Sequence, residues 1–511
     1  MTDSQRASQI LGIGLPSPSV TPALRPWIAD RKVGIVVLYR SNLASETEVR
    51  KLTAEIRELA GTPSLAPIVA VDQEGGSVIR YEPAAIPGAM ALGAIGSERI
   101  ARISGAHVGC ALRSAGITMN FAPTLDLSSA ADSSDLGTRA ISDDPDLVGR
   151  ISTAFLNGMR SAGVLGVAKH FPGQGFATAD PHLGAAEVDR SPELMRRTDL
   201  APYAAAIESG ALDGVMAAHV SYPAWAGSDG IPASLSPRLL QSLLRRELGF
   251  DGLVVTDAMH MRGIAEEGEQ GELVVRAIEA GADVVLVVSP RSAHSGYVAL
   301  LEAMRSGRLS RARVDASVAR VLEAKRRAAL PAPDCRPDPG LALDLARRAV
   351  TVAPPVPVLD LPAELFIGVS GPLADAFAED RRILLPLKPG TNQIRLLTEQ
   401  IAEMVKPDSR WIAAIQNRSQ AGIIAGVVAR RPSARLVLVL LGSPHDAAGI
   451  AAEARVFAYG FRAESQRAAL EVLKGERCAA GRLPVSVEGV GPIGTGARCE
   501  PELSSEARGS R

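Results

Sequence analysis

Cysteine is scarce in this sequence and its few cysteines are widely separated. The 511 residues include four cysteines, Cys110, Cys335, Cys478 and Cys499, and no two of them have a Cys-x-x-Cys spacing. Closely and regularly spaced cysteines are typical of disulfide frameworks and zinc clusters. We therefore expect neither of these in this protein.

Aromatic residues, an excess of one charge and long apolar runs are also lacking. Aromatics make up 4% of the chain, and 55 basic against 56 acidic residues give a formal net charge of −1. This balance argues against partners such as nucleic acid or a membrane surface. No apolar run reaches the roughly 18 to 20 residues that span a bilayer, and Met1–Arg6 does not resemble the start of a signal peptide. These absences predict a cytoplasmic protein.

Short apolar runs recur through the first 330 residues, each followed by a polar loop and a helical pattern. Their spacing, about 30 to 50 residues, fits consecutive βα units and hence a parallel sheet. The runs are apolar rather than alternating, as expected for strands covered on both faces. Ile10–Leu15 is a weak eighth candidate. The seven clear runs are Val33–Leu38, Pro67–Val71, Ile117–Phe121, Val164–Ala168, Gly214–His219, Gly252–Thr256 and Asp283–Val288.

Polar side chains fall at or just after the carboxyl ends of these runs. A barrel would gather them at one end, where barrel enzymes build their active sites. A doubly wound sheet also places a site at strand carboxyl ends, but polar residues follow so many runs that a closed barrel is favoured. The fold class predicted is α/β, with a (β/α)8 TIM-like barrel. The polar residues at the carboxyl ends of the runs are Asp72, Asn120, Lys169, His170, His219 and Asp257.

Four segments follow from the changes in composition. Residues 1–330 form the predicted catalytic barrel, and residues 331–340 form a Pro-rich linker. Residues 341–492 alternate apolar runs with helical patterns, which predicts a smaller C-terminal α/β sandwich domain. Residues 493–511 are rich in Gly, Ser and Glu, which indicates a flexible tail. The apolar runs of the second domain are Leu365–Val369, Trp411–Gln416, Leu436–Leu441 and Arg455–Tyr459.

Two features could carry catalysis. Asp257 follows an apolar strand and is well placed as a nucleophile, although a helix N-cap for residues 258–260 is an equal alternative. Asp180 and His182 lie on a polar loop, where the carboxylate could set the tautomer and basicity of the imidazole. A solvated turn is the alternative for that pair.

Charged side chains around these residues could hold a ligand. Lys169 ends an apolar strand and needs an anionic or hydrogen-bonding partner, which could be substrate or a structural ion pair with Asp72 or Asp126. Arg139 lies in a long loop of the kind that is commonly functional. The sequence has no P-loop, no dinucleotide fingerprint and no HExxH motif. We therefore expect no cofactor and no metal, and a hydrolase or transferase acting on a polyhydroxylated substrate.

Four motifs in this order resemble glycoside hydrolase family 3, in its β-N-acetylhexosaminidase branch. The resemblance runs through residues 1 to about 330 and continues more loosely beyond them. It rests on the four motifs in combination, since none is specific alone. The motifs are Asp72-Gln-Glu-Gly-Gly with Arg80, Lys169-His170-Phe-Pro-Gly, Asp180-x-His182 and Val255-Thr-Asp257.

The resemblance implies a retaining exo-glycosidase that removes non-reducing terminal β-linked N-acetylglucosamine. Asp257 would be the nucleophile that forms the glycosyl-enzyme intermediate, and His182 the acid/base with Asp180 as its partner. An imidazole can donate a proton when charged and accept one when neutral. A carbohydrate or muropeptide substrate and a role in cell-wall fragment recycling are expected. The sugar-binding residues implied are Asp72, Arg80, Arg139, Lys169 and His170.

The sequence departs from the family pattern at three places and leaves alternatives open. Gln174 stands where a histidine is usual, Ser77 where an arginine is usual, and Arg139-Ala-Ile where Arg-Ser-Phe is common. A phosphorylase, a non-catalytic sugar-binding protein and a lyase that forms a Schiff base on Lys169 are the alternatives. The natural aglycone and the oligomeric state stay open.

Overall fold

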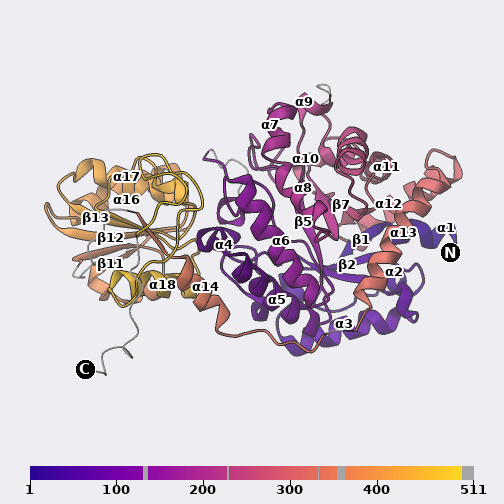
Figure 1. The fold of residues 1–511 in the computed structure, drawn as a ribbon, viewed down its shortest axis with the longest axis horizontal. Helices are drawn as coiled ribbons and strands as arrows, with labels where there is room; N and C mark the ends of the chain where they lie inside the picture. Colours follow the sequence, from indigo (N-terminus) through magenta and orange to yellow (C-terminus); the bar gives the residue numbers. More distant parts are fainter. Residues whose placement is uncertain (131–135, 227–229, 332, 354–362, 498–511) are drawn as a thin grey trace, which may run out of the picture. The chain divides into compact units, whose positions relative to one another are not determined.

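The computed structural model describes residues 1–130, 136–226, 230–331, 333–353 and 363–497. The chain forms two compact units, whose helices and strands are labelled in Figure 1. The first contains Met1–Gly93 and Ser97–Leu341, and the second contains Ala94–Gly96 and the residues from Ala342 onward. Most of the tail expected at residues 493–511 lies outside the described residues.

The first unit is a closed barrel. In its described part, eight parallel strands pair in chain order, and β1 pairs with β8 to close the ring. The predicted barrel is confirmed, with all seven clear runs as strands. The strands are β1 Leu11–Gly14, β2 Ile35–Leu38, β3 Ile68–Val71, β4 Met119–Asn120, β5 Leu165–Phe171, β6 Gly214–Ala217, β7 Leu253–Ala258 and β8 Val284–Val287.

The weak candidate at Ile10–Leu15 is the strand that closes the barrel. Ile13 of β1 pairs with Val36 of β2 on one side and with Val287 of β8 on the other. A Cβ at Gly14 would lie 2.7 Å from the Val288 carbonyl oxygen. Because this atom belongs to the backbone just after β8, the close approach of that segment requires a glycine at position 14.

Helices surround the barrel strands (Figure 1). The long ones are amphipathic and capped, as in α3, where the Ser45 hydroxyl accepts a hydrogen bond from the Glu48 amide. The helices up to residue 328 are α1 Asp3–Gln9, α2 Arg25–Ala29, α3 Glu46–Ala60, α4 Ala89–Ile95, α5 Glu98–Ser114, α6 Pro145–Ser161, α7 Pro192–Arg197, α8 Ala201–Glu208, α9 Pro223–Ala226, η6 Arg238–Glu247, α10 Arg262–Ala265, α11 Gln270–Ala280, α12 Pro290–Arg305 and α13 Arg311–Ala328.

Helix α13 covers the amino end of the barrel. Its Val321 and Ala328 belong to one buried apolar cluster with the first residues of several strands, among them Ile68, Leu165 and Leu253. Because this end is plugged by apolar packing, the opposite end is the one available for polar chemistry. Among the described residues, no helix is both long and apolar enough to cross a membrane.

The second unit is an α/β domain. Its described part contains a six-stranded sheet in the order β11-β10-β12-β13-β14-β9, in which only β9 runs antiparallel to its neighbour. Helices lie on both faces of this sheet (Figure 1). The strands β9 and β11, three residues each, are too short to stand out in the sequence. The elements are β9 Thr351–Ala353, β10 Leu365–Gly368, β11 Arg382–Leu384, β12 Arg410–Ile415, β13 Arg435–Leu440, β14 Ala454–Phe457, α14 Leu341–Ala349, α15 Pro372–Asp375, α16 Thr391–Met404, α17 Arg418–Arg430 and α18 Ala463–Leu473.

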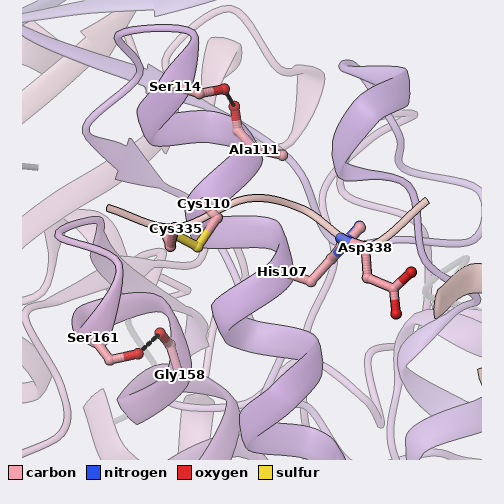
Figure 2. Close-up of a disulfide and its surroundings, with 8 residues drawn as sticks. All are labelled: His107, Cys110, Ala111, Ser114, Gly158, Ser161, Cys335 and Asp338. Atoms are coloured by element: carbon pink, nitrogen blue, oxygen red, sulfur yellow. Dashed lines mark hydrogen bonds between the residues drawn. A yellow bond between two sulfur atoms is a disulfide. The ribbon is translucent and has the colours of Figure 1, made fainter. Parts of the chain in front are cut away.

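The segment after α13 is fastened to α5 by a disulfide between Cys110 and Cys335 (Figure 2). Their Cα atoms lie 5.7 Å apart, and the Asp338 amide donates a hydrogen bond to His107 Nδ1, at 3.0 Å, one turn along the same helix. The sequence predicted no disulfide framework, and this bond corrects that expectation for Cys110 and Cys335. The two residues are 225 positions apart, so cysteine spacing along the chain carried no sign of the bond.

Candidate active site

The predicted site residues gather at the carboxyl ends of β3, β5 and β7. Asp72 follows β3 directly, whereas Lys169, His170 and Asp257 lie within the last residues of their strands rather than after them. All of β5 is buried. Strand geometry therefore fixes the backbone of these groups, which is more precise than placement on a loop.

Lys169 lies between two carboxylates. Its Nζ is 2.7 Å from Asp72 Oδ1 and 2.6 Å from Glu74 Oε1. Burial alone would lower the pKa of Lys169, but Asp72 and Glu74 raise it, so the amine stays charged. The ion pair with Asp72 that the sequence offered is present, while Asp126 has a different partner. A permanently charged Lys169 does not suit the Schiff-base alternative, which needs a neutral amine.

Glu74 contacts both cations of this cluster. It was not among the site residues predicted from the sequence. It also receives the Arg139 guanidinium, with Nε 2.8 Å from Oε2 and Nη2 3.0 Å from Oε1. Burial alone would raise the pKa of Glu74. Arg139 and Lys169 nevertheless hold this pKa well below its ordinary value. Two cations thus share one buried anion, and Asp72, a quarter exposed, is the carboxylate nearer to solvent. The sequence could have indicated Glu74, because it lies two positions after Asp72 in the segment that directly follows β3.

His170 is oriented by Asp126. Its Nδ1 lies 2.7 Å from Asp126 Oδ2, and the same carboxylate accepts hydrogen bonds from the His170 and Gln174 amides. Asp126 therefore sets the direction of the His170 ring and leaves Nε2 as its free polar end. From the sequence, a structural role was expected for Asp126. It also holds the start of the loop at Gln174, where the chain departs from the family pattern.

Asp257 is an ionised carboxylate at the end of β7. Its Oδ1 accepts a hydrogen bond of 2.7 Å from the Ala258 amide. Burial alone would raise its pKa, but His170, His219 and Lys169 lower it. The N-cap interpretation is wrong, because residues 257 and 258 continue β7 and α10 begins only at Arg262.

His219 lies beside Asp257 at the end of β6. Its Nδ1 is 2.8 Å from the Ser234 hydroxyl, and its Nε2 is buried without a hydrogen-bond partner among the described residues. Burial lowers the pKa of His219, although Asp257 opposes the shift. The imidazole and the carboxylate therefore interact electrostatically at this end of the barrel.

Tyr39 and Arg80 interact with the carboxylates of the site. Burial, with Asp72 and Asp257, raises the pKa of Tyr39 to about 12, and Arg80 opposes this. These four groups therefore lie close enough to interact. Gln73 positions Arg80, since its Oε1 accepts a hydrogen bond of 2.9 Å from the Arg80 amide.

Asp180 and His182 form a pair on an exposed loop. His182 Nδ1 lies 2.8 Å from Asp180 Oδ1, and the His182 side chain is 58% exposed. Asp180 thereby fixes the ring and directs Nε2 away from itself. The two side chains therefore form a hydrogen-bonded pair, and the imidazole is accessible from solvent.

Contacts tie this loop to the segment that follows Asp257. The Gly263 amide donates a hydrogen bond of 2.9 Å to the Pro181 carbonyl, and a Cβ on Gly263 would come equally close to that oxygen. At the base of the loop, the Arg190 guanidinium lies 3.7 Å from the centre of the Phe176 ring and 2.9 Å from Asp199. His260 interacts with both Asp257 and His182, so the pair and the carboxylate face one region.

The structure thus brings all eight predicted site residues to one end of the barrel. Within the described residues, no group of three or more histidine, cysteine or acidic side chains is arranged to hold a metal ion. An ionised carboxylate, an accessible imidazole and a cluster of charged donors and acceptors can support acid/base and nucleophilic chemistry on a sugar.

Comparison with known proteins agrees with this geometry. A model of the glycosyl hydrolase family 3 N-terminal domain matches residues 7–324. The chain is 36% identical over 299 residues to a beta-hexosaminidase of Idiomarina loihiensis, covering 57% of this chain and 87% of that protein. It is 37% identical over 293 residues to one of Stenotrophomonas maltophilia, covering 55% and 84%.

A solved structure is similar over both units. A family 3 beta-N-acetylglucosaminidase from Paenibacillus sp. str. FPU-7 superposes with a TM-score of 0.84 at 29% identity, covering 96% of this chain and 99% of the other. The family match spans more than half of the chain and contains the whole barrel with its polar end. This chain is therefore a glycoside hydrolase and belongs to glycoside hydrolase family 3.

Proposed function

We propose that the protein is a retaining exo-β-N-acetylglucosaminidase that hydrolyses non-reducing terminal β-linked N-acetylglucosamine. In this proposal Asp257 attacks the anomeric carbon and His182 protonates the leaving oxygen. Water then hydrolyses the aspartyl glycosyl-enzyme, with His182 as the base. The beta-hexosaminidase relatives support the choice of sugar.

The observation that carries the proposal is the contrast between Asp257 and the Asp180–His182 pair. Asp257 has a lowered pKa and is held by a backbone amide, which suits a nucleophile that must be ionised. The His182 side chain is exposed and binds Asp180 through Nδ1, which suits a group that exchanges protons at Nε2. One group is fixed and charged, while the other can change its charge.

The charged cluster is proposed to hold the sugar. Asp72 and Arg80 are partly exposed, so they can contact hydroxyl groups directly. Lys169, His170 and Arg139 are oriented by carboxylates, and in this proposal their remaining donors bind the sugar. Hydrogen bonds to ionised groups contribute roughly 1.5–3 kcal/mol each, enough in combination to fix a ring.

Trapping of the intermediate tests the proposal. A 5-fluoro N-acetylglucosaminyl fluoride should label wild type at Asp257, as mapped by peptide mass spectrometry, and should not label D257N. Proton NMR should show the β-anomer of N-acetylglucosamine as the first product. Labelling at another residue, or the α-anomer as first product, would overturn the assignment.

Phosphorolysis is a second candidate, and His260 is the observation that favours it. Two imidazoles, His182 and His260, lie in the region of Asp257, so an anionic acceptor meets no carboxylate acid/base to repel it. Turnover of an aryl N-acetyl-β-glucosaminide with and without phosphate distinguishes the two. N-acetylglucosamine 1-phosphate as the main product would replace hydrolysis by phosphorolysis.

Cell-wall fragments that end in N-acetylglucosamine are the proposed substrates. The sequence predicted recycling of such muropeptides in the cytoplasm, but the Cys110–Cys335 disulfide favours an oxidising compartment. We therefore propose that the fragments are cut outside the cytoplasm. Alkylation of the protein in intact cells, followed by mass spectrometry, should find both cysteines protected; free thiols at both would restore the cytoplasmic location.

A further inference from the structure

A cavity lies at the end of the barrel opposite the active site. Its volume is about 530 Å³, which is within the range of small-molecule sites. It opens where β3 and β4 begin, beneath the end of α13. The apolar part of its lining includes Pro63, Ala66, Ile68, Ala328, Leu330 and Pro331.

Three basic side chains line this cavity and no acidic one does among the described residues. They are Arg57 of α3, Arg113 of α5 and Lys325 of α13. Burial, together with the charge of Arg57, lowers the pKa of Arg113, so the two guanidinium groups repel each other. Elsewhere in the barrel buried cations have carboxylate partners, as Arg245 has Asp283 at 2.6 Å. Here the positive charges are left uncompensated.

Lys325 is the most unusual of the three. Its side chain is 3% exposed, and its Nζ donates to two carbonyls, those of Val33 at 3.2 Å and Leu65 at 3.1 Å. An ammonium group has three N–H donors, so one donor remains for a ligand. Burial lowers the pKa of Lys325 to about 7, and no carboxylate in the described part of the chain offsets this shift.

The wall of the cavity is held in place. Arg113 donates to the carbonyls of Ala328, at 2.7 Å, and Leu330. Just beyond Leu330 and Pro331, Cys335 is bonded to Cys110 on the same helix as Arg113 (Figure 2). A site that is formed before a ligand arrives loses less ordering entropy on binding.

We propose that this cavity binds a small organic anion, a carboxylate attached to an apolar body. The carboxylate would lie among Arg57, Arg113 and Lys325, and the apolar body against the prolines, Ile68 and Leu330. The free donor of Lys325 and the guanidinium groups match a carboxylate. The site is separate from the sugar-binding end, so it does not depend on the proposed function.

Calorimetry with hexanoate tests the site. Hexanoate should bind wild type and raise its Tm, whereas hexanol, which has the same chain without the charge, should not. K325M keeps the length and apolar stem of the lysine and should weaken binding by ~10-fold or more, as expected for loss of a charged hydrogen bond. R57Q, at the exposed rim of the cavity, should also weaken hexanoate binding. This variant replaces K325M in the test if K325M does not fold.

The pH dependence gives an independent readout. Bound carboxylate favours charged Lys325, so wild-type affinity should fall as pH rises from about 6 to about 8.5, through the pKa near 7. The neighbouring charges, Arg57 and Arg113, stay protonated throughout. K325M should lose this dependence, while D257N, changed at the other end of the barrel, should bind hexanoate as wild type does.

Three results would overturn the proposal. The first is no hexanoate binding to wild type, and the second is binding unchanged in both K325M and R57Q. The third is binding of inorganic phosphate or hexanol as tight as that of hexanoate, because either would remove the need for a carboxylate on an apolar body.

Discussion

Glu74 and Arg139 form a bidentate ion pair, with their two N–O distances at 2.8 and 3.0 Å. The pair is buried and joins the end of β3 to the loop that carries Arg139. Lys169 shares the same carboxylate. Glu74 therefore neutralises the two cations that we propose bind the sugar, and its own side chain is 4% exposed.

Replacing Glu74 should destabilise the protein strongly. E74Q leaves Arg139 and part of the Lys169 charge uncompensated in a buried setting, which typically costs about 3–5 kcal/mol. E98Q is the matched control, since Glu98 pairs with Arg150 in solvent and should change stability by less than about 1 kcal/mol. Urea denaturation measures both. Equal effects of the two substitutions would show that the cluster is not organised by Glu74.

The same carboxylate predicts how stability depends on pH. The folded pKa of Glu74 lies well below its unfolded value of 4.5, so its stabilisation is present above pH 4.5 and is lost as pH falls toward the folded pKa. The difference in unfolding free energy between wild type and E74Q should therefore shrink with acidification from about pH 5 to about pH 3. A difference that stays constant over this range contradicts the assignment.

His182 should matter most for poor leaving groups. H182A removes the proposed proton donor and should lower kcat by about 10²–10⁴ on alkyl or sugar aglycones. On a nitrophenyl aglycone, which leaves without a proton, the first step should be nearly unaffected. D180N should give a smaller loss in the same direction, because the ring remains but loses its orienting partner. Equal losses for all aglycones would remove His182 from the acid role.

Lys325 predicts a dependence on pH of the same sense as that of Glu74, in a higher pH range. Its folded pKa is about 7, against an ordinary 10.5, so between these values the unfolded chain binds a proton that the folded protein does not. Stability of wild type relative to K325M should therefore rise as pH increases through this window, by up to a few kcal/mol. Thermal unfolding of the two proteins at several pH values checks this, and a relative stability that falls with pH would place the amine in a different environment.

The disulfide should stabilise the first unit. The C110A/C335A double variant loses a bond that closes a very long loop, and an unfolding free energy lower by about 2–4 kcal/mol is expected. Equilibrium unfolding under non-reducing conditions measures it. An unfolding midpoint equal to that of wild type would mean that the hydrogen bond between Asp338 and His107 is enough to hold the segment after α13.

Sequence patterns predicted the barrel because each strand signals itself locally, through an apolar run with a polar residue at its end. Even Ile10–Leu15 contained β1. The choice of partners could not be predicted this way. Lys169 pairs with Glu74 and Asp72, and Asp126 pairs with His170, because strand register and loop paths bring those atoms together. Cys110 and Cys335 met for the same reason.

The bond between Cys110 and Cys335 makes a covalent ring of the chain from α5 to the segment after α13. The loop with His182 lies inside that ring, and its Leu183 is 71% exposed. A protease that cuts beside Leu183 opens the ring but releases no fragment. The clipped protein should migrate as one band without reductant and as two with it, so cleavage of the chain and separation of the two fragments become distinct events.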